Sequence, residues 1–233
     1  MATPGAVHFA ASEWQQLLRF RVGAACYSPG ANCAGCRQPM DPGGDHALSC
    51  ASNGTYRRHN HLRDCLISLS QLAGWYPELE QSIPGTRCRP ADLLLRSAAS
   101  RPLAVDVTVS HPLRSSAPSA VREGRSSAAG EAERTKVAQS KGACQAAGWD
   151  FCPFGVDSTG GLGPSARQLC RRLAKALAMR AGADTATLSE NVGTRISLAL
   201  AKGRGEMVCA ATPLPTSSLP FRTPSYPPRP HPV

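Results

Sequence analysis

An aspartate interrupts the most strand-like apolar segment of this chain. Asp106 stands in the middle of residues 103–109, where every other residue except Thr108 is apolar. A second apolar run, residues 91–95, precedes it, and the small and polar residues 97–101 between the two runs predict a β-hairpin. An ionised carboxylate inside such a strand is costly unless a metal ion or hydrogen bonds compensate for its burial. The segment therefore predicts a hairpin with an acidic site built into it.

Strand pairing across a five-residue loop sets Asp92 opposite Asp106. Opposed side chains in an antiparallel pair have Cβ atoms about 5 Å apart. Two carboxylates at that separation repel each other, and a divalent cation would relieve the repulsion. The alternative is that each aspartate lies at a strand end and points into water, which suits Asp92 better than the central Asp106. The hairpin thus predicts a carboxylate pair suited to a divalent cation.

Two lysines on the helix predicted over residues 128–147 are the cationic candidates for this site. Lys136 and Lys141 are five residues apart in the sequence, which separates them by about 140° around a helix. They cannot both face one site. Each can equally be a solvated surface lysine, which is the interpretation that the spacing alone favours.

Four metal-ligand side chains fall within a short stretch nearer the N-terminus. Cys33 and Cys36 are separated by two residues, and His46 and Cys50 by three. A Cys-x2-Cys pair can place both thiolates on one tetrahedral ion, and the turn-forming residues 40–44 let the His–Cys pair complete four ligands. The spacing predicts a structural Zn²⁺ site, with buried thiols and a satisfied histidine as the alternative. Substitute ligands in this part of the chain are Cys26, His59 and His61.

The net charge of +10 is unevenly distributed along the chain. A helix predicted to begin at Pro164 carries five basic side chains before Gly182 and no acidic one. Such a helix favours a nucleic acid, because neutralised phosphates release counterions, and a solvated helix face is the alternative. The predicted nucleic-acid contacts lie on this helix and at the start of an earlier one: Arg57, Arg58, Arg63, Arg167, Arg171, Arg172 and Lys175.

The hydrophobic pattern predicts an α/β protein with a small mixed sheet flanked by helices and an N-terminal zinc knuckle. The predicted helices cover residues 14–20, 59–73, 128–147, a segment from 164 onward, and 189–201. Beside the hairpin, strands are expected at 78–83 and 149–156 and a mobile loop at 112–127. We divide the chain into an N-terminal helix and knuckle (1–55), the α/β domain (56–205) and a disordered, proline-rich tail (206–233), since eight prolines fall within 211–233.

Several classes of protein do not fit the sequence. The N-terminus does not resemble a signal peptide, and no apolar run approaches membrane-spanning length. The ten cysteines are therefore expected in a reducing, intracellular compartment, where metal binding or burial is favoured over disulfides. The turn at residues 160–163 lacks the Gly-Lys-Ser/Thr ending of a nucleotide-binding loop, so we expect no nucleotide cofactor but a tight turn that can contact a phosphate. No nucleophilic triad is evident around Ser110 and His111.

Several short motifs, taken in order, resemble one protein family. They are Gly44-Asp45-His46-Ala47-Leu48-Ser49-Cys50, Arg58-His59-Asn60-x2-Arg63-Asp64, Arg89-Pro90-Ala91-Asp92, Ala104-Val105-Asp106-Val107-Thr108-Val109 and Gly148-Trp149-Asp150-Phe151-x-Pro153-Phe154. Over roughly residues 14–205 the chain resembles the restriction-like endonuclease domain that follows the reverse transcriptase in non-LTR retrotransposon proteins, within the PD-(D/E)xK nuclease superfamily. No reverse transcriptase precedes it in this sequence, so we expect a fragment, a truncated element copy or a reused host protein.

The resemblance implies a Mg²⁺- or Mn²⁺-dependent endonuclease that cuts DNA in the nucleus. It implies metal ligation by Asp92 and Asp106, a helical lysine best matched by Lys136, and a further acid at Glu80. Thr108 stands where the superfamily usually carries its lysine, so the ammonium group has to reach the site from the helix. The alternatives are an inactive module derived from such a domain that binds DNA or RNA, and a zinc-stabilised protein-interaction domain.

Overall fold

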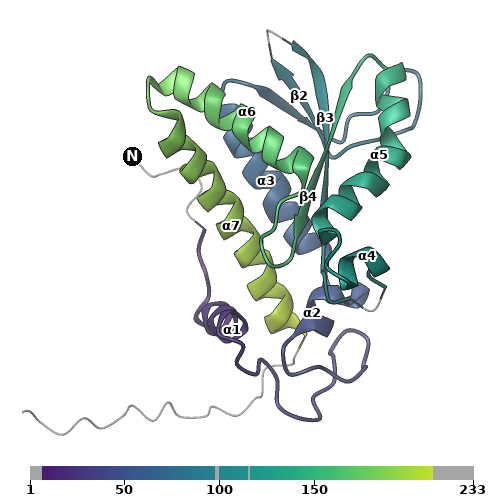
Figure 1. The fold of residues 1–233 in the computed structure, drawn as a ribbon, viewed down its shortest axis with the longest axis vertical. Helices are drawn as coiled ribbons and strands as arrows, with labels where there is room; N and C mark the ends of the chain where they lie inside the picture. The colour runs from purple at the N-terminus through teal and green to yellow at the C-terminus, as the bar shows by residue number, and fades with distance from the viewer. Residues whose placement is uncertain (1–6, 98–99, 115, 212–233) are drawn as a thin grey trace, which may run out of the picture.

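A four-stranded sheet stands at the centre of this computed structural model, which describes residues 7–97, 100–114 and 116–211 (Figure 1). Its strands lie in sequence order: β1 (Tyr76–Leu79), β2 (Leu93–Ser97), β3 (Ser100–Ser110) and β4 (Asp150–Asp157). The first three are antiparallel neighbours, and β4 runs parallel to β3. The predicted α/β fold with a small mixed sheet is therefore confirmed.

The β2–β3 hairpin has the expected register at Leu93–Leu95, but its strands extend into the predicted five-residue loop, because Ser97 pairs with Ser100 after a register shift that follows Leu95. Leu93 pairs with Val105, so the next residue pair in the same register is Asp92 and Asp106. The Asp92 N–H donates to the Val105 carbonyl oxygen at 3.1 Å, which holds Asp92 against β3 although β2 begins one residue later. The pairing places the two aspartates at adjacent positions of neighbouring strands.

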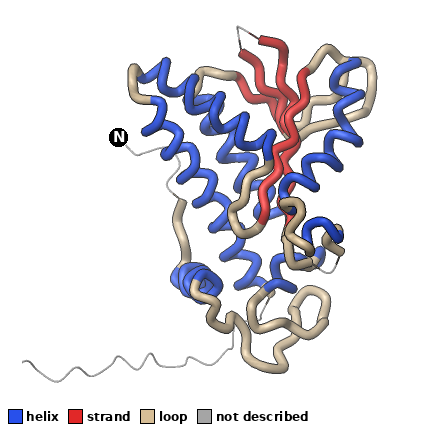
Figure 2. Tube along the Cα trace, viewed as in Figure 1, coloured by secondary structure: helices blue, strands red, loops and turns tan. Residues whose placement is uncertain are grey.

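The two faces of the sheet pack against different helices (Figure 2). The main core joins one face to α3 (Tyr56–Leu72), α6 (Pro164–Ala181) and α7 (Thr185–Ala210). The opposite face packs on α5 (Ala128–Ala146) through a smaller cluster: Leu94, Ala104, Cys144 and Trp149. Because side chains alternate along a strand, Asp92 and Asp106 belong to the face of Leu94 and Ala104, which is the α5 face.

A glycine lets α5 lie close to the sheet. A Cβ added at Gly155 in β4 would lie 2.6 Å from the carbonyl oxygen of Ala129 in α5. Two backbone segments meet at this point, so the contact cannot be relieved by a side-chain rotation. The close approach brings Lys136, two helical turns beyond Ala129, over β3 at Asp106.

Gly155→Ala is expected to destabilise the fold by about 1–3 kcal/mol, because the added methyl group overpacks this backbone contact. Chemical denaturation would measure the change. Gly142→Ala on α5 is the matched control, since a Cβ there meets no atom within 4 Å, and it should leave stability unchanged or raise it. Equal free energies of unfolding in the two variants would contradict the close approach of α5.

The N-terminal region packs on the far end of α7. It contains α1 (Ala11–Arg21), the short helix α2 (Asp45–Ser49) and one 3-10 turn, η1 (Ala51–Asn53). The contact forms a second hydrophobic cluster, in which residues of the knuckle meet Met207 and Val208 of α7. The knuckle is thus supported by a helix from the opposite end of the chain.

Three segments differ from the sequence-based prediction. The last helix continues beyond the predicted residues 189–201, because its Gly203 packs against Arg58, where a Cβ would lie 2.6 Å from the Arg58 Cα. β1 ends earlier than the predicted strand 78–83, since Glu80 takes a left-handed φ of 45°. A helical turn, α4 (Ser119–Arg122), lies in the segment that was expected to be a loop.

The end of α7 also shortens the predicted tail. Glu206–Ala210 is helical, so the tail expected from residue 206 has its first residues inside the helix. Residues 212–233, where the rest of that prediction falls, lie outside the described residues. Of the helices in the described ranges, none combines the length and the hydropathy that a membrane crossing requires.

Candidate metal centre and acidic site

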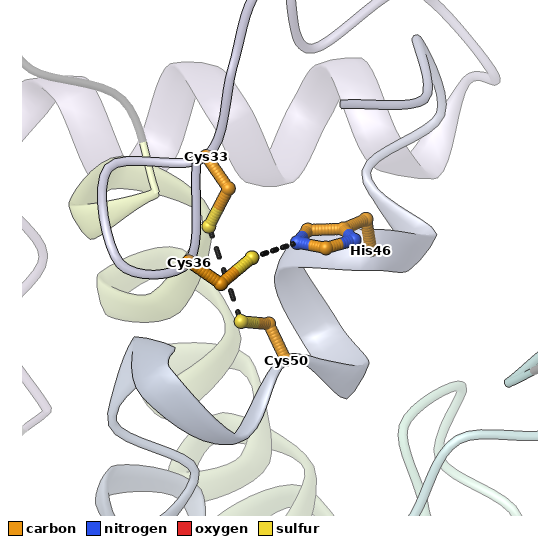
Figure 3. Close-up of side chains that lie close together, drawn as sticks. All are labelled: Cys33, Cys36, His46 and Cys50. Atoms are coloured by element: carbon orange, nitrogen blue, oxygen red, sulfur yellow. Dashed lines mark hydrogen bonds between the residues drawn. The ribbon is translucent and has the colours of Figure 1, made fainter. Parts of the chain in front are cut away.

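Four ligand side chains converge in the N-terminal region (Figure 3). The Sγ atoms of Cys33 and Cys50 are 3.9 Å apart, and Cys36 Sγ lies 3.2 Å from His46 Nε2. All four ligand atoms lie within 4.8 Å of one another. A tetrahedral zinc site with Zn–S bonds of about 2.3 Å has ligand atoms about 3.8 Å apart. The cluster predicted from spacing is therefore present and has the dimensions to hold zinc.

Local backbone structure brings the two ligand pairs together. The Arg37 N–H donates to the Cys33 carbonyl oxygen at 2.8 Å, and Arg37 takes a left-handed φ of 62°, which closes the Cys-x2-Cys turn. Asp41 then caps α2 by accepting from the backbone N–H groups of Asp45 and His46, at 2.8 and 2.6 Å. This cap fixes the start of the helix that carries the histidine ligand.

The thiols of the cluster differ in acidity. Burial opposes ionisation of Cys33, but the backbone N–H groups of Cys36 and Gly35 outweigh it and lower the pKa of Cys33 to about 7. Burial and a hydrogen bond with Cys36 raise the pKa of Cys50 to about 11. A metal ion binds the thiolate forms, so its binding at neutral pH would release protons from the cluster.

The substitute ligands considered from sequence lie elsewhere. His61 Nε2 is 3.0 Å from Glu206 on α7, and His59 is bonded to Asp92. Cys26 is buried beside the knuckle but is not one of the four clustered ligands. The Cys33, Cys36, His46 and Cys50 set is the group that the fold assembles.

A second site lies on the α5 face of the hairpin. Asp106 is only 6 % exposed, and its Oδ2 is 3.1 Å from Lys136 Nζ. Burial raises the pKa of Asp106, and the neighbouring carboxyl of Asp92 adds to the rise, while the charge of Lys136 opposes it. The structure thus brings together both predicted aspartates and one of the two candidate lysines.

Asp92 is held in place by two donors. Its Oδ2 accepts from the Val107 N–H at 2.7 Å and lies 2.9 Å from His59 Nε2. Although burial opposes the shift, the interaction with His59 lowers the pKa of Asp92, and the same hydrogen bond raises the pKa of His59. Asp92 is therefore the more readily ionised member of the carboxylate pair.

His59 is the member of this site that sequence reasoning misses. Apolar periodicity predicts the helix that carries it, α3, but the sequence indicates His59 only as a substitute zinc ligand. Its position beside the Arg58 and Asn60 of a recognised motif was the available signal. Periodicity does not show which strand the first turn of a helix faces, so the contact with Asp92 could not be inferred.

Lys141 and Glu80 do not join the carboxylate pair. Lys141 is exposed and lines a separate cleft at β4. The Glu80 carboxylate points to the surface, where it forms a salt bridge with Arg89 at 3.2 Å. The Glu80 backbone nevertheless lies beside Asp92, since its N–H donates to the Asp92 carbonyl oxygen at 2.9 Å, and its role as a further acid stays a prediction. Lys136 is the lysine that reaches Asp106.

The arginines predicted to contact nucleic acid from α3 differ in exposure. Arg58 is 3 % exposed and donates to the Leu48 carbonyl oxygen at 2.7 Å, so it joins α3 to the knuckle and is not available to a ligand. This burial corrects the prediction for Arg58. Arg57 is half-buried, and Arg63 forms a salt bridge with Asp64 at 2.8 Å.

The basic residues of α6 are exposed as predicted: Arg167, Arg171, Arg172 and Lys175. Within the described ranges, the ion pairs of lysine and arginine involve other residues, so these four side chains have no carboxylate partner there. They lie on a helix that covers the opposite face of the sheet from the carboxylate pair. The predicted basic surface is therefore present but does not adjoin Asp92 and Asp106 on one face.

The N-terminus of α6 is already occupied by a carboxylate. Glu133 of α5 is buried and accepts from the backbone N–H groups of Gly155, Ser165 and Ala166 at 2.9–3.2 Å. A Cβ at Gly163 would overlap the same carboxylate. A phosphate cannot bind these N–H groups as well, which corrects the expectation of a phosphate contact at the turn of residues 160–163.

A chain of three polar side chains, of which His111 and Ser158 are buried, also links the knuckle to the sheet. The His111 ring bonds to Ser158 through Nδ1 and to Asp45 through Nε2, at 3.1 Å for the latter. The order serine, histidine, aspartate is that of a hydrolase triad, but Ser158 is fully buried and no substrate can reach it. These residues therefore tie α2 to the ends of β3 and β4.

Comparison with known proteins identified no relative. No family model matches the chain, and neither the curated proteins nor the solved structures gave a match. Function is accordingly inferred from the two groups of residues that the fold assembles, the Cys–His cluster and the aspartate–lysine site.

Proposed function

We propose that this chain is a metal-dependent DNA endonuclease related to the restriction-like domains of non-LTR retrotransposons. Asp92 and Asp106 hold the catalytic Mg²⁺ or Mn²⁺, and Lys136 assists phosphodiester hydrolysis. The convergence of these three side chains carries the proposal, since they come from three separate elements. Zinc in the Cys–His cluster has a structural role, because all four ligand positions are filled by protein.

The donor set suits a hard divalent cation. Two carboxyl groups from neighbouring strands offer oxygen ligands, which Mg²⁺ and Mn²⁺ prefer. Ionising both carboxyls is unfavourable where Asp106 is buried, although Lys136 contacts Asp106 and His59, whose pKa is raised, contacts Asp92. A divalent cation would favour the ionised form of both carboxyls; when bound, it polarises a phosphate and lowers the pKa of a water molecule.

The surrounding side chains position this pair and add charge. His59 and the Val107 N–H fix one oxygen of Asp92, which orients this carboxyl toward Asp106. Lys136 keeps 31 % of its side chain exposed while it contacts Asp106, so its ammonium group can also meet a phosphate oxygen. A fixed ammonium group at this point stabilises negative charge that develops during hydrolysis.

Lys136→Ala is expected to lower the rate of plasmid nicking about 10²-fold or more, because it removes that charge from the site. Nicking of supercoiled plasmid in Mg²⁺ or Mn²⁺ at saturating protein would measure the rate. Arg134→Ala is the matched control, since Arg134 is an exposed cation on the same helix and pairs with Glu131 at the surface. Equal rates in the two variants would contradict the role of Lys136.

A non-catalytic nucleic-acid-binding module is the second candidate function. One observation favours it: the exposed cations of α6 lie on the other face of the sheet from the carboxylate pair. DNA binding by the wild-type protein, with no nicking in either metal, would support this candidate over the endonuclease.

A further inference from the structure

A polar cleft lies at the outer edge of β4, between α5 and α6. Its volume is about 290 Å³. Lys141 and Gln145 line it from α5, Gln168 and Arg172 from α6, and Asp150 from the start of β4. We call this space, lined by these five residues, the β4-edge cleft. The cleft exists because β4 is the last strand of the sheet, so no further strand fills the space between the two helices.

The loop after β4 covers only the far end of this edge. Leu162 forms a bridge with Val156, and the Gly163 N–H donates to the Gly155 carbonyl oxygen at 2.8 Å. The edge near Asp150 is left open to the cleft. An elongated ligand can therefore lie across the start of β4.

Two cations face the cleft from opposite walls. Arg172 is placed by Trp75, whose ring centroid lies 5.7 Å from the guanidinium carbon. Lys141 extends from α5, and in the described part of the chain neither cation forms a salt bridge. Asp150 is the one acidic residue that lines the cleft. The lining is thus net positive, and the exposed Arg171 and Lys175 of α6 extend the positive charge.

The positive charge beside the cleft is concentrated on one helix, α6. Arg89, Arg96, Arg125 and Arg134 each pair with a nearby glutamate. The α6 cations have no such partner in the described residues, as is also true of Arg37, Arg101 and Arg122, but they are gathered on one helix that carries no acidic residue, which favours a polyanion. The amide groups of Gln145 and Gln168 add uncharged donors between the two cations, and the helix N-terminus takes no part because Glu133 occupies it.

We propose that the β4-edge cleft binds the phosphodiester backbone of nucleic acid at a point separate from the cleavage site. The proposal rests on the proposed function in taking nucleic acid as the ligand. Helix α5 serves both places: Lys136 reaches Asp106 on one side, and Lys141, about 140° further around the helix, reaches the cleft on another. Lys141 and Arg172 contact phosphates, and α6 continues the path.

Binding of a labelled DNA duplex, measured by fluorescence anisotropy without added divalent cation, tests the proposal. Lys141→Ala combined with Arg172→Gln should weaken binding about tenfold at about 0.1 M salt and reduce the slope of log affinity against log salt by about 1.8, for two lost phosphate contacts. Asp150→Asn should strengthen binding, because it removes the one negative charge from the cleft.

The matched control is Arg96→Gln combined with Arg125→Gln, which changes net charge equally at two surface ion pairs. Its affinity should stay at the wild-type value. Equal weakening in the two double variants, unchanged affinity in the cleft variant, or no DNA binding by the wild type would each overturn the proposal. So would weaker binding by Asp150→Asn.

The outcome is distinguishable from that of the endonuclease proposal. If the cleft variant binds DNA weakly while the wild type never nicks plasmid, the proposal for the cleft is supported and the endonuclease proposal is contradicted. If the wild type nicks plasmid and the cleft variant binds DNA normally, the endonuclease proposal is supported and the proposal for the cleft is contradicted. Glu190→Gln, at an exposed position of α7, should bind the duplex as the wild type does, since Glu190 lies outside both the cleft and the aspartate–lysine site.

Discussion

Asp106→Asn is expected to reduce plasmid nicking by about 10³-fold or more, because the carboxylate proposed to hold the metal ion is replaced by a neutral amide. Asparagine has nearly the same shape and can still meet Lys136, so the loss would report on charge and not on packing. The rate would be measured in Mg²⁺ and in Mn²⁺ across a concentration series of each ion. Mn²⁺ binds more tightly to most sites and should recover part of the activity.

The same variant should keep or gain stability at neutral pH. Burial and the neighbouring Asp92 raise the pKa of Asp106, so the folded chain holds this proton more tightly than the unfolded chain does. The associated stability is present at low pH and is lost as the pH rises through the raised, folded-state pKa. Asparagine does not ionise, so the advantage of the variant in thermal unfolding should grow from acid to neutral pH.

A surface acid provides the control for this variant. Glu190→Gln makes the same kind of change at an exposed position on α7 and should leave nicking unchanged. Wild-type nicking by Asp106→Asn would remove the carboxylate pair from the mechanism. A fall in melting temperature at neutral pH would instead show that the ionised carboxylate stabilises the fold.

Cys33→Ser combined with Cys50→Ser is expected to abolish metal binding and to lower the melting temperature by about 10 °C or more, since structural zinc contributes several kcal/mol. The wild type should retain about one zinc ion per chain through purification, as a closed four-ligand site does. Elemental analysis and thermal unfolding would measure both effects. Chelation of the metal from the wild type should reproduce the shift.

The destabilisation caused by loss of zinc should be largest where the knuckle packs against α7. Met207 and Val208 of α7 lie against the knuckle, and the Tyr27 hydroxyl donates to the Val208 carbonyl oxygen at 2.7 Å. Hydrogen exchange should therefore rise in the knuckle and the last turns of α7 before it rises in the sheet. Cys88→Ser, at an exposed thiol outside the cluster, is the control. Full zinc content in the double variant would exclude the proposed ligands.

Local spacing made two features of this molecule predictable. The register at Leu93–Leu95 was predictable, because a strand that slips by one residue turns every side chain to the other face, although the five-residue loop used to infer it was wrong: Ser97 pairs with Ser100 after a register shift. The knuckle spacing gave the cluster of Cys33, Cys36, His46 and Cys50. In both cases the residues that meet are close in sequence, so short-range geometry decides the outcome.

Features that depend on packing between distant elements could not be predicted. The choice of Lys136 over Lys141 depends on how α5 sits over the sheet, which Gly155 of β4 helps to set. The burial of Arg58 depends on Gly203 at the other end of the chain. Helix propensity alone predicts that a glycine within a helix destabilises the helix, whereas here the glycine allows a tertiary contact.

Helix α5 directs three side chains to three different places, and this limits the insertions and deletions that the helix can accept. Glu133 caps α6, Lys136 meets Asp106, and Lys141 lines the cleft beyond β4. Insertion or deletion of a single residue between Glu133 and Lys141 would rotate one part of the helix by about 100° relative to the other. Substitutions at the exposed positions between them are tolerable, but a change in the length of this segment is not, so genuine relatives should keep these three residues at fixed intervals.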